Sequence, residues 1–105
     1  MSVDTGADVS WKDRASLEDH FRRHGREVGA RDAEDYLRIA REVMRVGQRF
    51  TYRLGVRARV GYYHARSKRF VAVDAATGRI LSLSRRSENY PRNLADSDYS
   101  RKGQK

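Results

Sequence analysis

Two stretches in the first half of the chain have apolar residues at helical spacing. The first predicted helix begins at Ser16 and stops at Gly25, and the second begins at Asp32 and ends at Gly47. In each, an acid stands three residues after the start, as in a capping box. The apolar stripe of the second helix consists of Ala33, Tyr36, Leu37, Ala40, Val43 and Met44.

After Gly47 the pattern changes from helical to alternating. β-branched and aromatic residues then recur in four short segments, at 50–54, 56–63, 69–74 and 79–84. Consecutive strands with such short links pair as an antiparallel meander. We therefore predict an α+β fold, with two N-terminal helices packed on one face of a three- or four-stranded antiparallel sheet. We expect the other sheet face to be free.

The chain has 105 residues, which suits one domain with a single small core. Residues 1–14 are polar, small and acidic, and they predict a flexible arm. We assign residues 15–86 to the folded domain. Residues 87–105 are polar and predict a partly disordered C-terminal tail.

Lys and Arg number 23 against 14 Asp and Glu, for a net charge of +9. Much of this excess lies in residues 46–70, where seven bases and no acid are interleaved with aromatic residues. Such a distribution favours a polyanionic partner, most often nucleic acid. The chain has no cysteine, no apolar run longer than four residues and no N-terminal signal pattern. These features argue against a disulfide framework, a membrane span and a secretory signal.

His20 and His24 are four residues apart on the first predicted helix, so they project side by side. Two imidazoles suit the cleavage of RNA, in which a base takes the ribose 2′-OH proton and an acid protonates the leaving 5′ oxygen. That reaction needs no metal and no other cofactor. The basic residues that we expect on phosphate are Arg57, Arg59, Lys68 and Arg85.

Other interpretations of these residues stay open. His20 and His24 have the spacing of a zinc-binding helix, but the usual glutamate is missing and only His64 is available as a third ligand. Tyr62 either stacks on bases or belongs to the core. Ser82 is expected to face away from the flanking leucines, where its hydroxyl either donates to a phosphate or meets solvent.

Three segments, at 17–30, 32–40 and 78–82, carry a more specific pattern. Together they resemble the C-terminal ribonuclease toxin domains of polymorphic bacterial toxins, which are similar to the fold shared by barnase, EndoU, colicin D and RelE-like toxins. The resemblance covers residues 16–86. Its strongest part is the first helix, where the matching residues are His20, Phe21, His24, Gly25 and Glu27.

The resemblance implies a metal-independent ribonuclease toxin that acts on tRNA or another RNA of translation. It assigns catalysis to His20, His24, Glu27 and Ser82, the last of which stands where threonine is usual. A toxin of this charge is expected to have an acidic immunity protein or antitoxin as partner, because opposite charges speed association. Action in a bacterial cytoplasm follows if RNA is the substrate. Whether the chain is a stand-alone toxin or a toxin domain delivered from another cell stays open.

Two other classes of function compete with a ribonuclease. A non-catalytic nucleic-acid-binding module would use the same arginines and show salt-dependent binding without turnover. An antitoxin or assembly protein would use the helices as its working surface, and would tolerate the neutralisation of residues 46–70.

Overall fold

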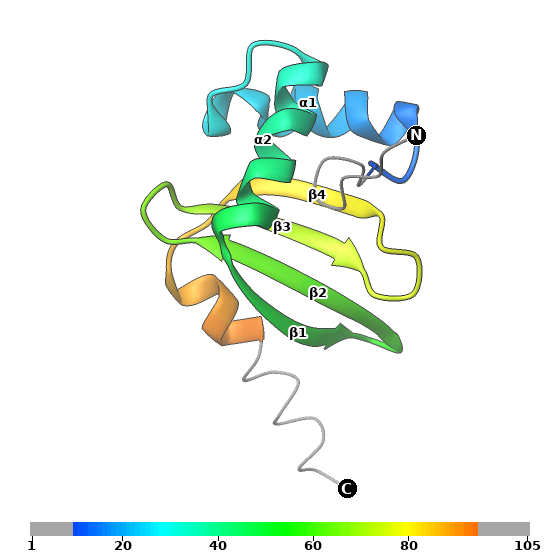
Figure 1. Cartoon of the computed structure of the whole chain (residues 1–105), viewed down its shortest axis with the longest axis vertical. Helices are drawn as coiled ribbons and strands as arrows, with labels where there is room; N and C mark the ends of the chain where they lie inside the picture. Colours follow the sequence, from blue (N-terminus) through cyan, green and yellow to red (C-terminus); the bar gives the residue numbers. More distant parts are fainter. Residues whose placement is uncertain (1–9, 95–105) are drawn as a thin grey trace, which may run out of the picture.

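The structure is a computed structural model of the chain and describes residues 10–94. Two helices precede an open four-stranded antiparallel sheet, so the predicted α+β fold is confirmed (Figure 1). The elements are α1 (Arg14–Val28), α2 (Ala33–Val46), β1 (Gln48–Leu54), β2 (Arg57–His64), β3 (Arg69–Asp74) and β4 (Ile80–Arg85). A short helical segment at 89–94 follows.

Both long helices begin at an aspartate. Asp13 and Asp32 each accept the backbone N–H three residues later, at 2.7 and 2.8 Å, which satisfies donors that a first helical turn leaves unpaired. The predicted start of α2 is confirmed. The predicted start of α1 at Ser16 is wrong because Asp13 is the cap. α1 also continues through Gly25 and ends at Gly29, whose φ of 83° lies in the left-handed region.

The strands follow one another across the sheet in the order β1-β2-β3-β4. Each neighbouring pair is antiparallel, as expected for a meander with short links. All four observed strands lie within two residues of the predicted segments. The alternating pattern therefore located the sheet correctly.

The main core lies between the helices and one face of the sheet. α2 crosses β2, β3 and β4, while α1 lies along β4 (Figure 1). The largest fully buried side chains here are Tyr36, Val43, Val71, Ile80 and Leu83. The hydroxyl of Tyr36 donates to the carbonyl of Leu83 and ties α2 to β4. Burial raises the pKa of this phenol.

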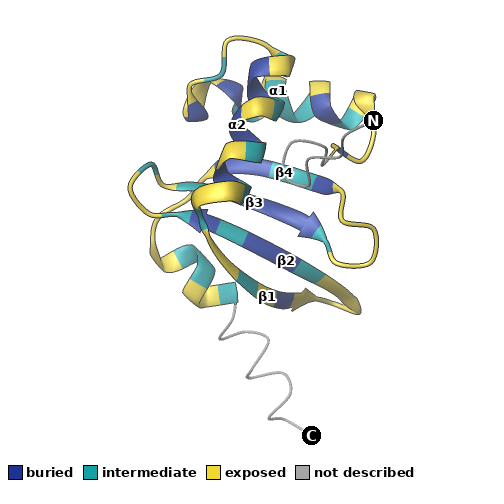
Figure 2. Ribbon diagram, in the orientation of Figure 1, coloured by how far each residue is buried: buried dark blue, intermediate teal, exposed yellow. Residues whose placement is uncertain are grey.

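The opposite sheet face carries a second apolar cluster, formed by Tyr52, Tyr63, Phe70 and Ala72. Residues 89–94 cover part of it, with the ring centroid of Tyr90 at 5.2 Å from that of Phe70. Figure 2 shows that the middles of the central strands are buried while the links are exposed. The prediction that this face is free is therefore wrong for the part that residues 89–94 cover, and the ordered packing continues beyond residue 86. Residues 87–94 contain few apolar residues, so no hydrophobic periodicity in the sequence predicts that this segment packs on the sheet.

Trp11 belongs to the folded domain and not to an arm. It is 5% exposed and forms a parallel bridge with Ile80 of β4. The N–H of Lys12 donates to the carbonyl of Ile80 at 3.0 Å, and the N–H of Ile80 donates to the carbonyl of Ser10 at 2.9 Å. Residues 10–12 thus cover part of the outer edge of β4. The arm predicted for 1–14 is corrected from residue 10 onward, and residues 1–9 lie outside the described part of the chain.

β4 contains a bulge that changes which side chains share a face. Ala72 pairs with Ser82 and Val73 pairs with Ile80, so Leu81 is an extra residue. Leu83 belongs to the helix-side core, whereas Leu81 packs against the second cluster. The expectation that both leucines lie on the face opposite Ser82 is therefore wrong.

Candidate functional site: a histidine pair between α1 and β4

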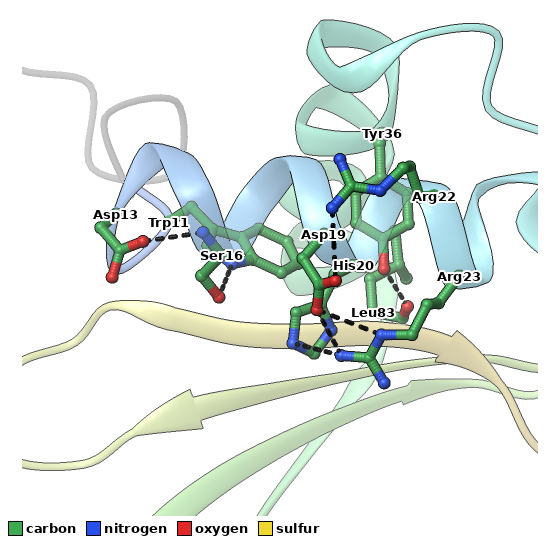
Figure 3. Close-up of polar contacts among 9 residues, drawn as sticks. All are labelled: Trp11, Asp13, Ser16, Asp19, His20, Arg22, Arg23, Tyr36 and Leu83. Atoms are coloured by element: carbon green, nitrogen blue, oxygen red, sulfur yellow. Dashed lines mark hydrogen bonds and ion pairs between the residues drawn. The ribbon is translucent and has the colours of Figure 1, made fainter.

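One face of α1 carries both predicted histidines and Glu27. The spacings of four and three residues put these side chains on the same side of the helix. His20 points from α1 toward β4 (Figure 3). The ring centroids of His20 and His24 are 5.9 Å apart. The predicted juxtaposition of the two imidazoles is confirmed.

Glu27 connects His24 to β4. Its Oε2 lies 3.1 Å from Nδ1 of His24 and accepts the backbone N–H of Arg85 at 2.9 Å. Because a carboxylate accepts, Nδ1 of His24 is the donor. Within residues 10–94, Nε2 of His24 has no hydrogen-bond partner. The side chains of His24 and Glu27 are 23% and 36% exposed, so the pair is shielded yet reachable.

His20 lies between Trp11 and Arg23. The ring centroid of Trp11 is 5.6 Å away, and Nη2 of Arg23 is 3.4 Å from Nε2 of His20 (Figure 3). A guanidinium only donates, so Nε2 accepts and Nδ1 of the neutral ring carries the hydrogen. Nδ1 is buried and has no hydrogen-bond partner among residues 10–94. An unpartnered buried polar atom costs stability, and a catalytic role is one of the reasons for which a native protein retains such an atom.

The surroundings of His20 favour its neutral form. Burial lowers the pKa of His20, and the charges of Arg23 and of His24 lower it further, against the opposite effect of Asp19. Asp19 itself accepts two hydrogen bonds from Arg23, at 3.1 and 2.8 Å, which lower the pKa of that carboxyl. At neutral pH His20 is therefore an uncharged imidazole that can accept a proton.

Two arginines of the sheet lie at the Glu27 end of α1. Arg69 and Arg85 are register partners. Arg85 stands two residues after Leu83 on β4, and residues two apart on a strand share a face, so both arginines lie on the helix side of the sheet. Nη2 of Arg69 donates to the carbonyl of Val28 at 2.7 Å. We define the α1–β4 site as His20, Arg23, His24, Glu27, Arg69 and Arg85.

Three further predicted residues differ in their relation to this site. Lys68 is exposed in the β2–β3 link, and its carbonyl accepts the N–H of Arg86 at 2.9 Å, so it lies at the Arg85 end of the sheet. Ser82 pairs with Ala72 of the second cluster, which places its hydroxyl on the face away from α1. Tyr62 is partly buried against the helix-side core and is not a free stacking platform.

Arg57 and Arg59 lie at the other end of the sheet. Arg59 is the register partner of both Tyr52 and Asp74, and it lies on the face away from the helices, as expected. Arg57 precedes it by two residues and shares that face. Both line a groove apart from the histidines. The structure thus separates the predicted phosphate-binding residues into two groups.

The zinc alternative gains no support from the donor set. Among residues 10–94, no group of three or more His, Asp or Glu side chains could hold a metal ion. His64, the third ligand that this alternative needs, has its Nδ1 at 2.7 Å from the hydroxyl of Ser67.

In the same described region, no helix combines the length and the apolar character needed to cross a membrane.

Sequence reasoning missed Trp11, Arg23 and Arg69. Arg23 follows His20 by three residues, a spacing that could have identified it. Trp11 is the only tryptophan of the chain, and a large apolar residue in a polar segment is itself a signal of burial. The contact between Arg69 and Val28 spans 41 residues and has no local signal.

Comparisons with known proteins identify no family for this chain. Searches against protein-family models, curated proteins and solved structures give no match. Its function therefore has to be inferred from the α1–β4 site, from the distribution of charge and from the resemblance of its motifs.

Proposed function

We propose that this protein is a metal-independent endoribonuclease toxin that cleaves tRNA or another RNA of translation. The observation that carries the proposal is that Glu27 holds Nδ1 of His24 beside a neutral His20. Metal-independent RNA cleavage needs two proton-transfer groups that work near neutral pH and cations around one phosphate. The α1–β4 site supplies both.

In the proposed reaction, Arg23 releases Nε2 of His20, and this nitrogen then accepts the proton of a ribose 2′-OH. The 2′ oxygen attacks phosphorus and the bond from phosphorus to the 5′ oxygen breaks. His24 enters this step as an imidazolium, with a hydrogen on each ring nitrogen, and gives the proton of Nε2 to the leaving oxygen. The products are a 2′,3′-cyclic phosphate and a 5′-hydroxyl end. Glu27 orients the ring of His24 through Nδ1 during this transfer.

We expect two positive charges near the histidines, those of Arg69 and Arg85, to assist the attack on phosphorus. The backbone N–H of Arg85 donates to the carboxylate of Glu27, so the backbone of Arg85 lies next to the Glu27–His24 pair. Arg69 is its register partner on the same face. Their guanidinium groups can bind the scissile phosphate and stabilise the negative charge that grows on it in the transition state.

The toxin part of the proposal rests on the motif resemblance and on the net charge of +9. A protein so basic is efficiently inhibited by an acidic partner, because opposite charges speed their association. We therefore propose an acidic immunity protein or antitoxin as its partner. The substrate implies action in a bacterial cytoplasm, either in the producing cell or in a rival.

The direct experiment incubates purified protein with total RNA in the presence of EDTA. We expect the wild type to cleave and His24→Ala to lose cleavage. Arg45→Ala is the control, because Arg45 is exposed on α2 and pairs with Glu42 at 2.6 Å, away from the histidines. Absence of cleavage by the wild type, or equal cleavage by His24→Ala, would contradict the proposal.

A non-catalytic nucleic-acid-binding module is the second candidate. It is favoured by the location of Arg57 and Arg59, which line a basic groove that contains no histidine. Such a groove can bind a polyanion without any proton transfer. This candidate predicts binding without product, and binding that His20 and His24 variants leave unchanged.

A further inference from the structure

Three segments that are distant in sequence form a groove at the start of β4. Lys12 comes from the segment before α1, Arg57 and Arg59 from the start of β2, and Arg79 from the β3–β4 link. The β1–β2 hairpin and the β3–β4 link lie at the same end of the sheet in Figure 1. The groove has a volume of about 410 Å³, and its other lining residues are Ala58, Asp74, Thr77 and Leu81.

The cations of this groove differ from those on the helices. Within residues 10–94, none of the four basic side chains is in an ion pair, whereas Arg14, Arg23, Arg38 and Arg45 each pair with a carboxylate. In the part of the chain that the structure describes, four cations and one carboxylate, that of Asp74, line the groove, which makes it strongly positive. Unpaired cations gathered in a concave surface attract an anion and bind it with fewer competing partners.

The local geometry favours a phosphate group. Nη1 of Arg79 donates to the carbonyl of Lys12 at 3.4 Å, which holds its guanidinium beside the segment that carries Lys12. The hydroxyl of Thr77 accepts the N–H of Arg79 at 3.2 Å, so its own hydrogen is left to donate. Planar guanidinium groups and a hydroxyl are the donors that phosphate oxygens usually meet in proteins.

The groove and the Arg85 end of the α1–β4 site cannot hold the same phosphate. Arg79 and Arg85 stand at opposite ends of β4, about 20 Å apart at the usual rise of a strand. Arg57 and Arg59 also lie on the sheet face away from the helices. A nucleic acid that reaches both places must therefore extend over several nucleotides.

We propose that this groove is a subsite for a non-scissile backbone phosphate of single-stranded RNA, formed by Lys12, Arg57, Arg59 and Arg79. The inference rests on the proposed function for the identity of its ligand. It names the substrate class more closely: the protein acts on RNA long enough to extend from the groove to the Arg85 end of the α1–β4 site. A dinucleotide bound at that end is too short to reach Arg79.

The test measures binding of a short single-stranded oligodeoxynucleotide by fluorescence anisotropy, because a strand without 2′-OH groups cannot be cut. We expect Arg57→Ala and Arg79→Ala each to weaken binding about five- to tenfold and to reduce the salt slope by about 0.7. Arg45→Ala removes the same charge from α2 and should leave affinity within about twofold.

Asp74→Asn gives a prediction of opposite sign. Its amide oxygen can still accept the N–H of Ala76, a bond of 2.9 Å in the wild type, so the link keeps its shape. Asp74 is the one acid that lines the groove among residues 10–94, so removing its charge should tighten binding about threefold. This variant keeps the inference testable if an arginine variant folds poorly.

The outcomes separate the groove from the ribonuclease. Normal binding by Arg57→Ala and Arg79→Ala, or unchanged binding by Asp74→Asn, overturns the groove whether or not RNA is cleaved. If the binding changes occur and the wild type cleaves no RNA, the groove stands as a nucleic-acid subsite and the proposed function fails. If RNA is cleaved, Arg79→Ala should raise the KM for a long RNA and leave cleavage of a dinucleotide unchanged.

Discussion

Oε2 of Glu27 accepts the backbone N–H of Arg85 at 2.9 Å, across 58 residues of sequence. The same oxygen lies 3.1 Å from Nδ1 of His24. One carboxylate therefore closes the contact between α1 and β4 and orients an imidazole. Because this oxygen contacts both β4 and His24, a substitution of Glu27 should affect both the stability of the fold and the rate of RNA cleavage.

Glu27→Gln should separate orientation from stability. The glutamine side chain can still accept the N–H of Arg85, so we expect the free energy of unfolding to change by less than about 1 kcal/mol. It carries no negative charge for His24, so RNA cleavage should fall at least about tenfold. Urea unfolding and initial rates check the two parts. An unchanged rate would show that Glu27 only supports the fold.

Glu27→Ala is the companion variant. It removes both hydrogen bonds of Oε2, so we expect a loss of about 1–2 kcal/mol of stability together with the loss of cleavage. A stability equal to that of the wild type would mean that the bond to Arg85 contributes nothing to the fold.

Trp11→Ala tests whether residues 10–12 belong to the domain. The Trp11 ring is buried against Tyr36, with centroids 5.3 Å apart, and against His20 at 5.6 Å. Its truncation should cost about 3–5 kcal/mol of unfolding free energy, measured by circular dichroism in urea. Trp11→Phe retains most of the packing and should cost clearly less. A flexible arm would predict no loss for either variant.

The pH dependence of stability should report on His20. Since the folded protein favours neutral His20, the pKa of this group is below its unfolded value of about 6.5. The unfolded chain then binds more protons in acid, so the stability that His20 contributes is complete above about pH 6.5 and is lost as the pH falls through the folded pKa.

His20→Gln should remove that dependence. Between about pH 7.5 and pH 5 the wild type should lose more unfolding free energy than His20→Gln, as measured by urea unfolding at both values. His64→Gln is the control, because His64 lies on β2 with its Nδ1 on Ser67. Equal losses in the wild type and in His20→Gln would mean that His20 is not held neutral.

Ser82→Ala tests whether Ser82 has the catalytic role that the motif resemblance assigns to it. The motif match assigns Ser82 to catalysis, but its pairing with Ala72 places it on the sheet face away from His20 and His24. We expect Ser82→Ala to retain cleavage within about threefold, whereas loss of a proton-transfer group costs about a hundredfold or more. A loss as large as that of His24→Ala would mean that RNA contacts both faces during the reaction.

Local patterns were sufficient for much of this fold. The stripe through Tyr36, Ala40 and Val43 located α2, because every turn of that helix meets the same core. The alternation of side chains along the chain also located the strands, because successive residues of a strand face the two sides of the sheet and these sides differ in burial. The spacing of His20 and His24 likewise placed them together.

The errors arose where one non-local contact decides the structure. Trp11 joins β4 through a single bridge to Ile80, and an isolated residue has no period. The bulge at Leu81 depends on how β3 and β4 meet, so alternation alone misassigned the face of that leucine. The bond from Arg85 to Glu27 depends on the packing of α1 against β4 and has no signal in either segment.

The central claim is that His24 and His20 cleave RNA by attack of a 2′-OH. Its most direct test is mass spectrometry of the products from a defined oligoribonucleotide in EDTA, beside the same strand with one 2′-deoxy position at the cut. The account predicts a 2′,3′-cyclic phosphate end, no cut at the 2′-deoxy position and no product with His24→Ala. Intact RNA, or cleavage that persists at the 2′-deoxy position, would contradict it.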